Sequence, residues 1–215
     1  MIERSLIAIT GTGGSGKSNL ARGLARGLNQ LDFPVEHISI GEYVREQAQQ
    51  TLARGVMASH YRQTIINHLN ASPLKAFDPD VIMGVAAECM QPSSARLMLF
   101  DGFPRYRGQL EQLFELSIRD DVVTRGAIET YVNEEEAVRR MTKRDDERAI
   151  SIEDAHRRYM TQKLGIEAVR TEILESGLLH TRIDTSFSKE RTLIEGFKLI
   201  EELGILPSSP YPLAG

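Results

Sequence analysis

The sequence contains a single cysteine, Cys89, among its 215 residues, so it can form neither an internal disulfide nor a zinc site with several cysteine ligands. It has no apolar run close to the roughly 18 to 20 residues that a membrane span needs. Residues 1–5 do not show the charged-then-apolar layout of a signal peptide. We therefore expect a protein of the reducing cytoplasm with no membrane partner.

An excess of positive charge is also missing. The chain has 26 Lys and Arg against 30 Asp and Glu, a formal net charge of −4, which gives no general reason to expect nucleic-acid binding. Hydrophobic residues make up 41% and charged residues 26%, which excludes a disordered or fibrous chain. The length suits one domain of roughly 200 residues, with a monomer as the expected state.

Five short apolar runs alternate with helical patterns along the chain. This alternation predicts a three-layer α/β fold with a five-stranded parallel sheet. Asn133 and Glu136 form a capping-box signal for a helix over 134–148, and the pair Asp78-Pro79 is typical of another helix start. The expected strands cover residues 5–10, 35–40, 96–100, 126–132 and 179–183.

Two stretches interrupt the alternation, one long and helical and one crowded with charge. Such excursions at the carboxyl ends of parallel strands commonly form substrate-binding subdomains and lids. We therefore expect one domain with a helical insert over 42–90 and a short lid over 139–158. The core then comprises residues 1–41, 91–138 and 159–206.

Residues 11–18 read Gly-Thr-Gly-Gly-Ser-Gly-Lys-Ser and fit the pattern G-x-x-x-x-G-K-[ST]. Small residues let backbone N–H groups turn toward phosphate oxygens at the positive end of the next helix. In this pattern Lys17 reaches the β- and γ-phosphates, and the Ser18 hydroxyl ligates Mg²⁺. The predicted ATP-binding residues here are Gly11, Thr12, Gly13, Gly14, Ser15, Gly16, Lys17, Ser18 and Asn19.

Two alternatives to this phosphate loop are weaker. An accidental glycine-rich turn is disfavoured because an apolar strand precedes the motif and a helical pattern follows it. A dinucleotide fingerprint also begins G-x-G, but the second strand ends at Ser39 and Ile40, without the acidic residue that fingerprint requires. The motif therefore predicts a nucleoside triphosphate site.

The third expected strand ends in a carboxylate, Asp101, beside the phosphate loop. An Asp at this place can hold a Mg²⁺-bound water, although capping of the next turn would also explain it. The continuation from Leu99 to Gln109, which contains Asp-Gly-Phe-Pro-Arg, resembles the signature of the adenylate kinase family of nucleoside monophosphate kinases. The stretch from His37 to Arg45 is similar to a second segment of that family.

The resemblance implies transfer of the γ-phosphoryl group from Mg²⁺-ATP to a nucleoside monophosphate. It implies that Arg45 and Arg105 clamp the acceptor phosphate, a role that suits the planar guanidinium fork. Gln109 would read the acceptor base, and Gln at this place is typical of AMP. The acceptor-binding residues implied in this way are Ser39, Ile40, Arg45, Gly102, Arg105 and Gln109.

Residues 139–148 supply the cations that a phosphoryl-transfer site needs where water is excluded. On a continuous helix Arg140, Arg144 and Arg148 would share one face, although a solvated, salt-bridged surface is the alternative. The family places a further arginine on the next helix, and Arg158 matches it. The expected catalytic residues are Lys17, Arg105, Arg140, Arg144 and Arg158, with Arg144 also binding ATP and with Ser18 and Asp101 holding the metal.

Two departures from the family leave the acceptor open. Ile40 stands where the family usually has Thr, and Ser18-Asn19 follows the lysine as in cytidylate-type kinases. The alternatives are a cytidylate-type or other small-molecule kinase, and a nucleotide-binding regulatory protein without turnover. A kinase of nucleic-acid ends is disfavoured by the acidic balance and the lack of an aromatic and basic patch.

Overall fold

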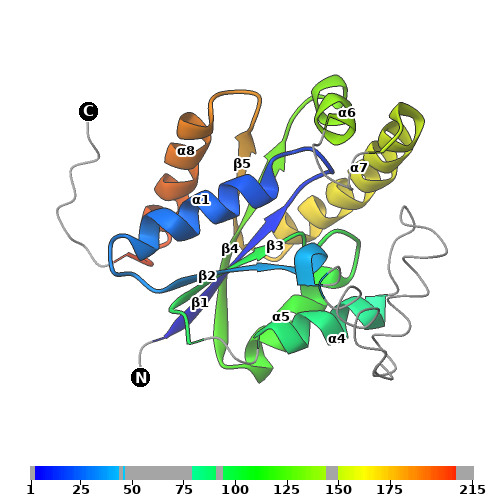
Figure 1. The fold of residues 1–215 in the computed structure, drawn as a ribbon. Helices are drawn as coiled ribbons and strands as arrows, with labels where there is room; N and C mark the ends of the chain where they lie inside the picture. The colour runs from blue at the N-terminus through cyan, green and yellow to red at the C-terminus, as the bar shows by residue number, and fades with distance from the viewer. Residues whose placement is uncertain (1–2, 44–45, 47–78, 91–93, 144–149, 207–215) are drawn as a thin grey trace.

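The computed structural model describes residues 3–43, 46, 79–90, 94–143 and 150–206. Five strands form one fully parallel sheet in the order β2-β3-β1-β4-β5, which confirms the predicted α/β fold (Figure 1). The strands are β1 (Arg4–Thr10), β2 (Val35–Ser39), β3 (Leu97–Asp101), β4 (Val122–Tyr131) and β5 (Leu179–Asp184).

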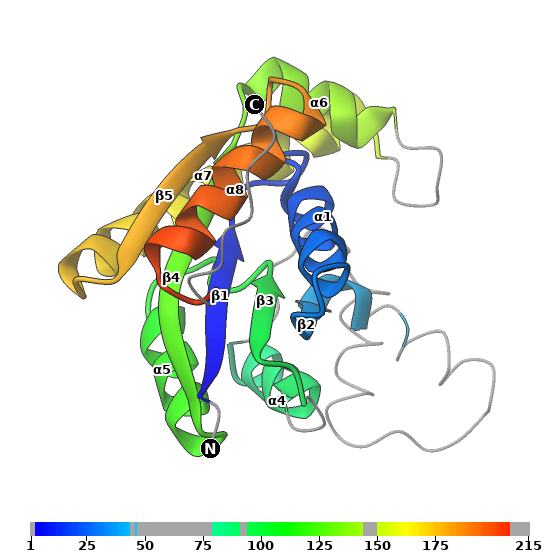
Figure 2. The same cartoon turned by 90° about the vertical axis from the view of Figure 1, so that its left-hand side faces the viewer.

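Helices cover both faces of the sheet. Figures 1 and 2 show α1 and α8 on one face and α4 and α5 on the other. Helix α7 packs on the side of α5, and α6 lies against α7. The helices are α1 (Lys17–Asn29), α4 (Pro79–Met90), α5 (Gln109–Arg119), α6 (Glu134–Thr142), α7 (Ile152–Glu175) and α8 (Lys189–Glu202).

The two-sided covering explains the continuous apolar runs in the strands. Successive strand residues point to opposite faces, so Ile7 and Ile9 pack with α1 and α8 while Leu6 and Ala8 pack with α4 and α5. All four residues are fully buried. A strand buried on both faces needs apolar residues at every position, which is why no polar alternation appears.

The strand order places the site. Strand β1 pairs with β3 on one side and β4 on the other. The connection that leaves β1 leads to one side of the sheet and the connection that leaves β3 leads to the other, so the strand order reverses between these two strands. In open α/β sheets ligands bind at such a reversal, outside the carboxyl ends of the strands. Ile9 of β1 aligns with Asp101 of β3, and the next N–H, that of Gly102, donates to the Ile9 carbonyl oxygen at 2.8 Å.

The structure corrects the start of one predicted strand and the end of one predicted helix. Strand β4 begins at Val122, four residues before the predicted start at Gly126, and a register shift opposite Leu6 and Ile7 accommodates the extension. The helix predicted over 134–148 ends at Thr142. Helix α7 runs unbroken from Ile152 to Glu175, so the expected boundary between lid and core at residues 158 and 159 falls within one helix.

The predicted helix start at Asn133 is confirmed, with one difference. The Asn133 side chain accepts the N–H of Glu136 at 2.8 Å, as an N-cap should. The Glu136 carboxylate does not return the bond. It binds Arg139 at 2.5 Å and Arg140 at 2.7 Å instead, because a guanidinium attracts a carboxylate more strongly than a backbone N–H does.

Candidate functional site

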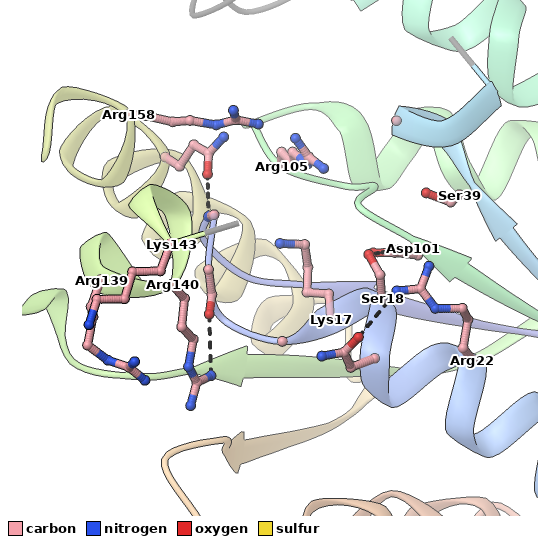
Figure 3. A pocket seen from close by; sticks show the side chains of 16 residues that line it. Lys17, Ser18, Arg22, Ser39, Asp101, Arg105, Arg139, Arg140, Lys143 and Arg158 are labelled. Atoms are coloured by element: carbon pink, nitrogen blue, oxygen red, sulfur yellow. Dashed lines mark hydrogen bonds between the residues drawn. The ribbon is translucent and has the colours of Figure 1, made fainter. Parts of the chain in front are cut away.

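A cleft of about 440 Å³ opens at the carboxyl ends of β1 and β3. Among the described residues that line it, cationic side chains outnumber the single carboxylate, Asp101. Figure 3 shows Lys17 in the middle, Arg105 and Arg158 on one side, Arg139 and Arg140 on another, and Ser18 and Asp101 on a third. Such a concentration of positive charge attracts a polyanion. The cationic lining residues are Lys17, Arg22, Arg105, Arg139, Arg140, Lys143 and Arg158.

The phosphate loop forms the floor of the cleft. Gly14 and Gly16 have φ of 78° and 84°, a left-handed conformation that glycine adopts without strain. A Cβ at Gly14 would overlap the carbonyl oxygen of Ala137, so α6 lies directly on the loop. The N–H groups of Gly14, Gly16 and Ser18 donate to no acceptor in the part of the chain that the structure describes. They are therefore left for the oxygens of a phosphate.

The backbone of the loop holds the Lys17 side chain in place. Its Nζ donates to the Thr12 carbonyl oxygen at 2.7 Å, which keeps the ammonium over the loop. Gly13, Gly14, Gly16, Ser18 and Asn19 line the cleft with it, whereas Gly11, Thr12 and Ser15 are not among the lining residues.

A chain of buried hydroxyl groups supports the loop from below. Ser15 Oγ and Thr130 Oγ1 share a hydrogen bond of 2.8 Å, and Thr130 Oγ1 donates to the Thr10 carbonyl oxygen at 3.3 Å. Thr10 Oγ1 in turn donates to the Pro104 carbonyl oxygen at 2.7 Å. Since Pro104 precedes Arg105, this chain links the phosphate loop to the segment that carries the predicted acceptor arginine.

Asp101 and Ser18 form the oxygen-rich end of the cleft. Ser18 Oγ donates to Asp101 Oδ2 at 2.5 Å, and His37 Nε2 lies 3.2 Å from the same oxygen. Burial acts to raise the pKa of Asp101, but the His37 hydrogen bond, the Lys17 charge and the Ser18 hydrogen bond outweigh it and lower this pKa. Asp101 is therefore an ionised carboxylate at neutral pH.

Hard oxygen donors of this kind suit Mg²⁺, which retains several waters and takes few protein ligands. The described residues contain no cluster of three or more His, Cys, Asp or Glu able to enclose a metal ion. Ser18 and Asp101 thus fit a metal that is held mainly through a bound phosphate.

Of the six expected acceptor-binding residues, two line the cleft, three do not, Gly102 among them, and one lies outside the described residues. Ser39 and Arg105 line the cleft. Ile40 and Gln109 do not: Ile40 is 4% exposed and packs in the core against β3 and α4, and Gln109 is 3% exposed. Arg45 lies outside the described residues.

Gln109 acts on the neighbouring loop. Its Oε1 accepts the N–H of Arg105 at 2.7 Å and that of Tyr106 at 3.1 Å. Both lone pairs of this oxygen are therefore used by the backbone. The carbonyl end of the amide shapes the turn that presents Arg105, and Gly102, with φ of 87°, begins that turn.

The lid arginines also divide. Arg140 and Arg158 line the cleft, whereas Arg144 and Arg148 lie outside the described residues. Arg140 is held by the backbone: Nη2 donates to the Thr185 carbonyl oxygen at 2.8 Å and Nη1 to that of Gly14 at 3.4 Å. This guanidinium ties α6 to the phosphate loop and to the loop after β5.

Several lining residues were not in the predicted set: Arg22, Gly41, Arg139, Lys143 and Gln162. Arg22 and Gln162 could have been predicted from the sequence. Arg22 follows Ser18 by four positions and Gln162 follows Arg158 by four, so each shares a helix face with a predicted site residue. Arg22 donates to Glu42 at 2.7 Å and to Asn19 at 3.2 Å.

A second hollow, of about 700 Å³, adjoins the cleft across Asn19, Arg22 and Arg140. Its other walls come from α1, α6, α8 and the loop after β5, including Leu20, Phe187 and Leu193. Apolar side chains beside a phosphate-binding loop provide a surface on which the base of a nucleotide can rest.

Comparison with known proteins gives the family. The sequence family described as an AAA domain matches residues 10–157. An adenylate kinase of Streptomyces griseus is 31% identical over 191 residues, 88% of this chain and 78% of the relative. One of Helicobacter hepaticus is 28% identical over 206 residues, 93% of each. An adenylate kinase of Helicobacter pylori is 25% identical over 139 residues, and the match spans just under two thirds of that relative, 66%.

No helix among the described residues has both the length and the apolar character needed to cross a membrane.

Proposed function

The chain belongs to the adenylate kinase family of P-loop kinases, and from this premise we propose that it transfers the γ-phosphoryl group of ATP reversibly to a nucleoside monophosphate, with AMP as the favoured acceptor. The observation that carries the proposal is the cleft itself. Cations from α1, α6, α7 and the loop after β3 converge on the phosphate loop, which is what two phosphate chains set end to end require.

In the proposed reaction an oxygen of the acceptor's α-phosphate attacks the γ-phosphorus of ATP. The bond from the γ-phosphorus to the bridging oxygen breaks, ADP leaves, and the acceptor becomes a diphosphate. No protein nucleophile is needed, because positioning and charge neutralisation supply most of the catalysis. Lys17 and the loop N–H groups would hold the donor phosphates, Arg105 the acceptor phosphate, and Arg158 the transferred group.

Ser18 and Asp101 would hold Mg²⁺, Ser18 through its hydroxyl and Asp101 through a bound water. The ion would neutralise charge on the β- and γ-phosphates. The chain's own contribution is the short Ser18–Asp101 hydrogen bond, which fixes both oxygens at the edge of the cleft.

The donor base would occupy the second hollow, beside Thr185 and Phe187. For the acceptor, we infer roles for Ser39, Arg45 and Arg105 from the family signature. Gln109 keeps an amide group able to donate to a base, since among the described residues the backbone takes only its carbonyl oxygen. We also propose that the protein works as a monomer in the cytoplasm, and light scattering would test the first of these.

The direct test is a coupled assay that measures ADP formed from Mg²⁺-ATP with AMP, CMP, UMP, dTMP or GMP. We expect AMP to give the highest kcat/KM. Lys17→Ala and Arg105→Ala should each lower turnover by about 10³-fold or more, since each removes a charge that faces the reacting phosphates. Near wild-type rates in folded variants would exclude these roles, and a preference for CMP would favour the cytidylate-type alternative.

A nucleotide-binding regulatory protein without turnover is the second candidate. The observation that favours it is Ile40, which stands where the family usually has Thr and is buried in the core, so one polar contact expected for the acceptor is missing. Tight binding of a two-substrate mimic, without phosphate transfer to any of the five monophosphates, would support this alternative.

A further inference from the structure

One face of α7 points toward the cleft. Arg158, Gln162 and Gly165 follow one another at intervals of four and three residues, so they lie on the same side of the helix. Arg158 and Gln162 line the cleft, and Gly165 lies against the turn that carries Arg105. This face therefore meets both the phosphate loop and the acceptor segment.

The contact with the phosphate loop is made by Gln162. Its Oε1 accepts the N–H of Gly13 at 2.5 Å. A Cβ at Gly13 would lie 2.7 Å from Met141 Sδ and 3.3 Å from Gln162 Oε1, so the helices approach the loop as closely as a glycine allows. The same hypothetical atom would lie 3.5 Å from Arg158 Nε, which places that guanidinium beside the donor loop.

The contact with the acceptor segment is made by the backbone of α7. A Cβ at Gly165 would overlap the carbonyl oxygen of Arg105 and lie 2.8 Å from Tyr106 Cδ1. The backbone of α7 at Gly165 thus packs directly against the Arg105 carbonyl and the Tyr106 ring. Glycine within a helix lowers stability by roughly 0.5–1 kcal/mol relative to alanine. The close packing that Gly165 allows here offsets this loss of stability.

The helix between these contacts is firmly held. Tyr159, Ile166 and Val169 are buried, Tyr159 in a cluster with α6 and Val169 in the core beneath the sheet. Arg170 binds the buried Glu129 of β4 through two bonds of 2.6 Å. A helix fixed along its length transmits a displacement at one contact to the other, because packed interiors deform little.

We propose that α7 is a spacer that sets the distance between the donor loop and the acceptor turn, with Gln162 as the positioning residue that couples them. The inference rests on the proposed kinase function. Phosphoryl transfer requires the reacting atoms about 3–3.5 Å apart, and a misplacement of about 1 Å can cost about 10²-fold in rate. Gln162 supplies a neutral acceptor for Gly13, where a carboxylate would repel the phosphates.

The test compares Gln162→Leu, which removes the acceptor atom at similar size, with Thr161→Leu, which places the same residue on the exposed side of α7. We expect Gln162→Leu to lower kcat by about 10–100-fold, with the dissociation constants of a non-hydrolysable ATP analogue and of AMP, each measured alone, within about threefold of wild type. Gln162→Glu should instead weaken binding of the ATP analogue.

Thr161→Leu should leave all of these quantities unchanged. A kcat for Gln162→Leu equal to that of Thr161→Leu would overturn the inference while leaving the kinase function intact. So would a loss of kcat matched by equal losses in both binding constants, which would indicate general damage. Absence of phosphate transfer by the wild-type protein would count against the proposed function.

A second measurement does not depend on turnover. The ATP analogue, added without AMP, should slow amide hydrogen exchange in residues 102–106 of the wild-type protein, and this response should be lost in Gln162→Leu. A wild-type protein without the response, or a variant that keeps it, would overturn the spacer role. Gly165→Ala, if it folds, should lose the response while retaining the Gln162 side chain.

Discussion

Replacing Glu129 with Gln should weaken the fold in a way that depends on pH. Glu129 is 2% exposed on β4, and Arg170 donates two hydrogen bonds of 2.6 Å to its carboxylate, with Arg182 at 3.2 Å. Burial acts to raise the pKa of Glu129, but His180, Arg170 and Arg182 outweigh it and lower this pKa from 4.5 to about 2. His180 Nε2 lies 3.5 Å from Glu129 Oε2, too far for a good hydrogen bond, so Arg170 is the main partner of this carboxylate.

The size of the effect follows from the two pKa values. A carboxyl with a pKa of 4.5 when unfolded and about 2 when folded contributes at most about 3 kcal/mol of stability. Solvent screens the pair, because the Arg170 and Arg182 side chains are 29% and 46% exposed, so we expect about 2 kcal/mol. A lowered pKa stabilises the fold fully above pH 4.5, and this contribution disappears as the pH falls toward about 2.

Urea unfolding of the wild-type protein and Glu129→Gln between pH 7 and pH 3 measures this difference. It should be about 2 kcal/mol at pH 7 and fall below half of that at pH 3. The matched control is Glu136→Gln: its pKa is also lowered to about 2, by hydrogen bonds from Arg139 and Arg140, but the pair lies on a helix surface. We expect at most about 0.5 kcal/mol there. Equal losses in the two variants, or a Glu129→Gln difference that stays constant with pH, would refute the reasoning.

Three further changes test other parts of the structure. Asp101→Asn should shift the Mg²⁺ concentration for half-maximal activity upward by about 10–100-fold, and an unchanged Mg²⁺ titration would exclude Asp101 from the metal site. Gly14→Ala should destabilise the protein and impair ATP binding, because φ is 78° and the new Cβ would overlap α6. Gly108→Ala, with φ of 83° and open space around it, should show only a strain of about 1–2 kcal/mol, and similar nucleotide affinities for the two variants would contradict the steric argument. Asn133→Ala should cost about 1 kcal/mol in thermal unfolding through loss of the N-cap bond to Glu136, and no change would mean that water replaces the cap.

The sequence was sufficient for the sheet and the phosphate loop, for a physical reason. Strands buried on both faces are apolar at every position, so β1 and β3 were visible as runs such as residues 6–9 and 97–100. The glycines of the loop are required by backbone geometry that few other residues adopt. Local rules of this kind do not depend on which distant segments come together.

The directions of individual side chains were not predictable in the same way. The place of Gln109 in the family signature predicts that it reads the acceptor base. In the structure its carbonyl oxygen accepts two N–H groups of the preceding turn. Ile40 belonged to a segment that borders the cleft, but an isoleucine gains more by entering the core. The contact between Gln162 and Gly13 joins residues 149 positions apart, and no local pattern encodes such a distance.

The close contact between Gly165 and the Arg105 turn affects how chimeras of this family can be built in the laboratory. Because the helix touches the Arg105 turn backbone to backbone, the two surfaces have matching shapes that neither segment specifies alone. In a chimera that takes α6 and α7 from a homologue but retains residues 102–106 of this chain, the imported α7 would pack against a turn whose shape does not match it. Productive crossovers should therefore exchange the two pieces together, as one unit that is discontinuous in the gene.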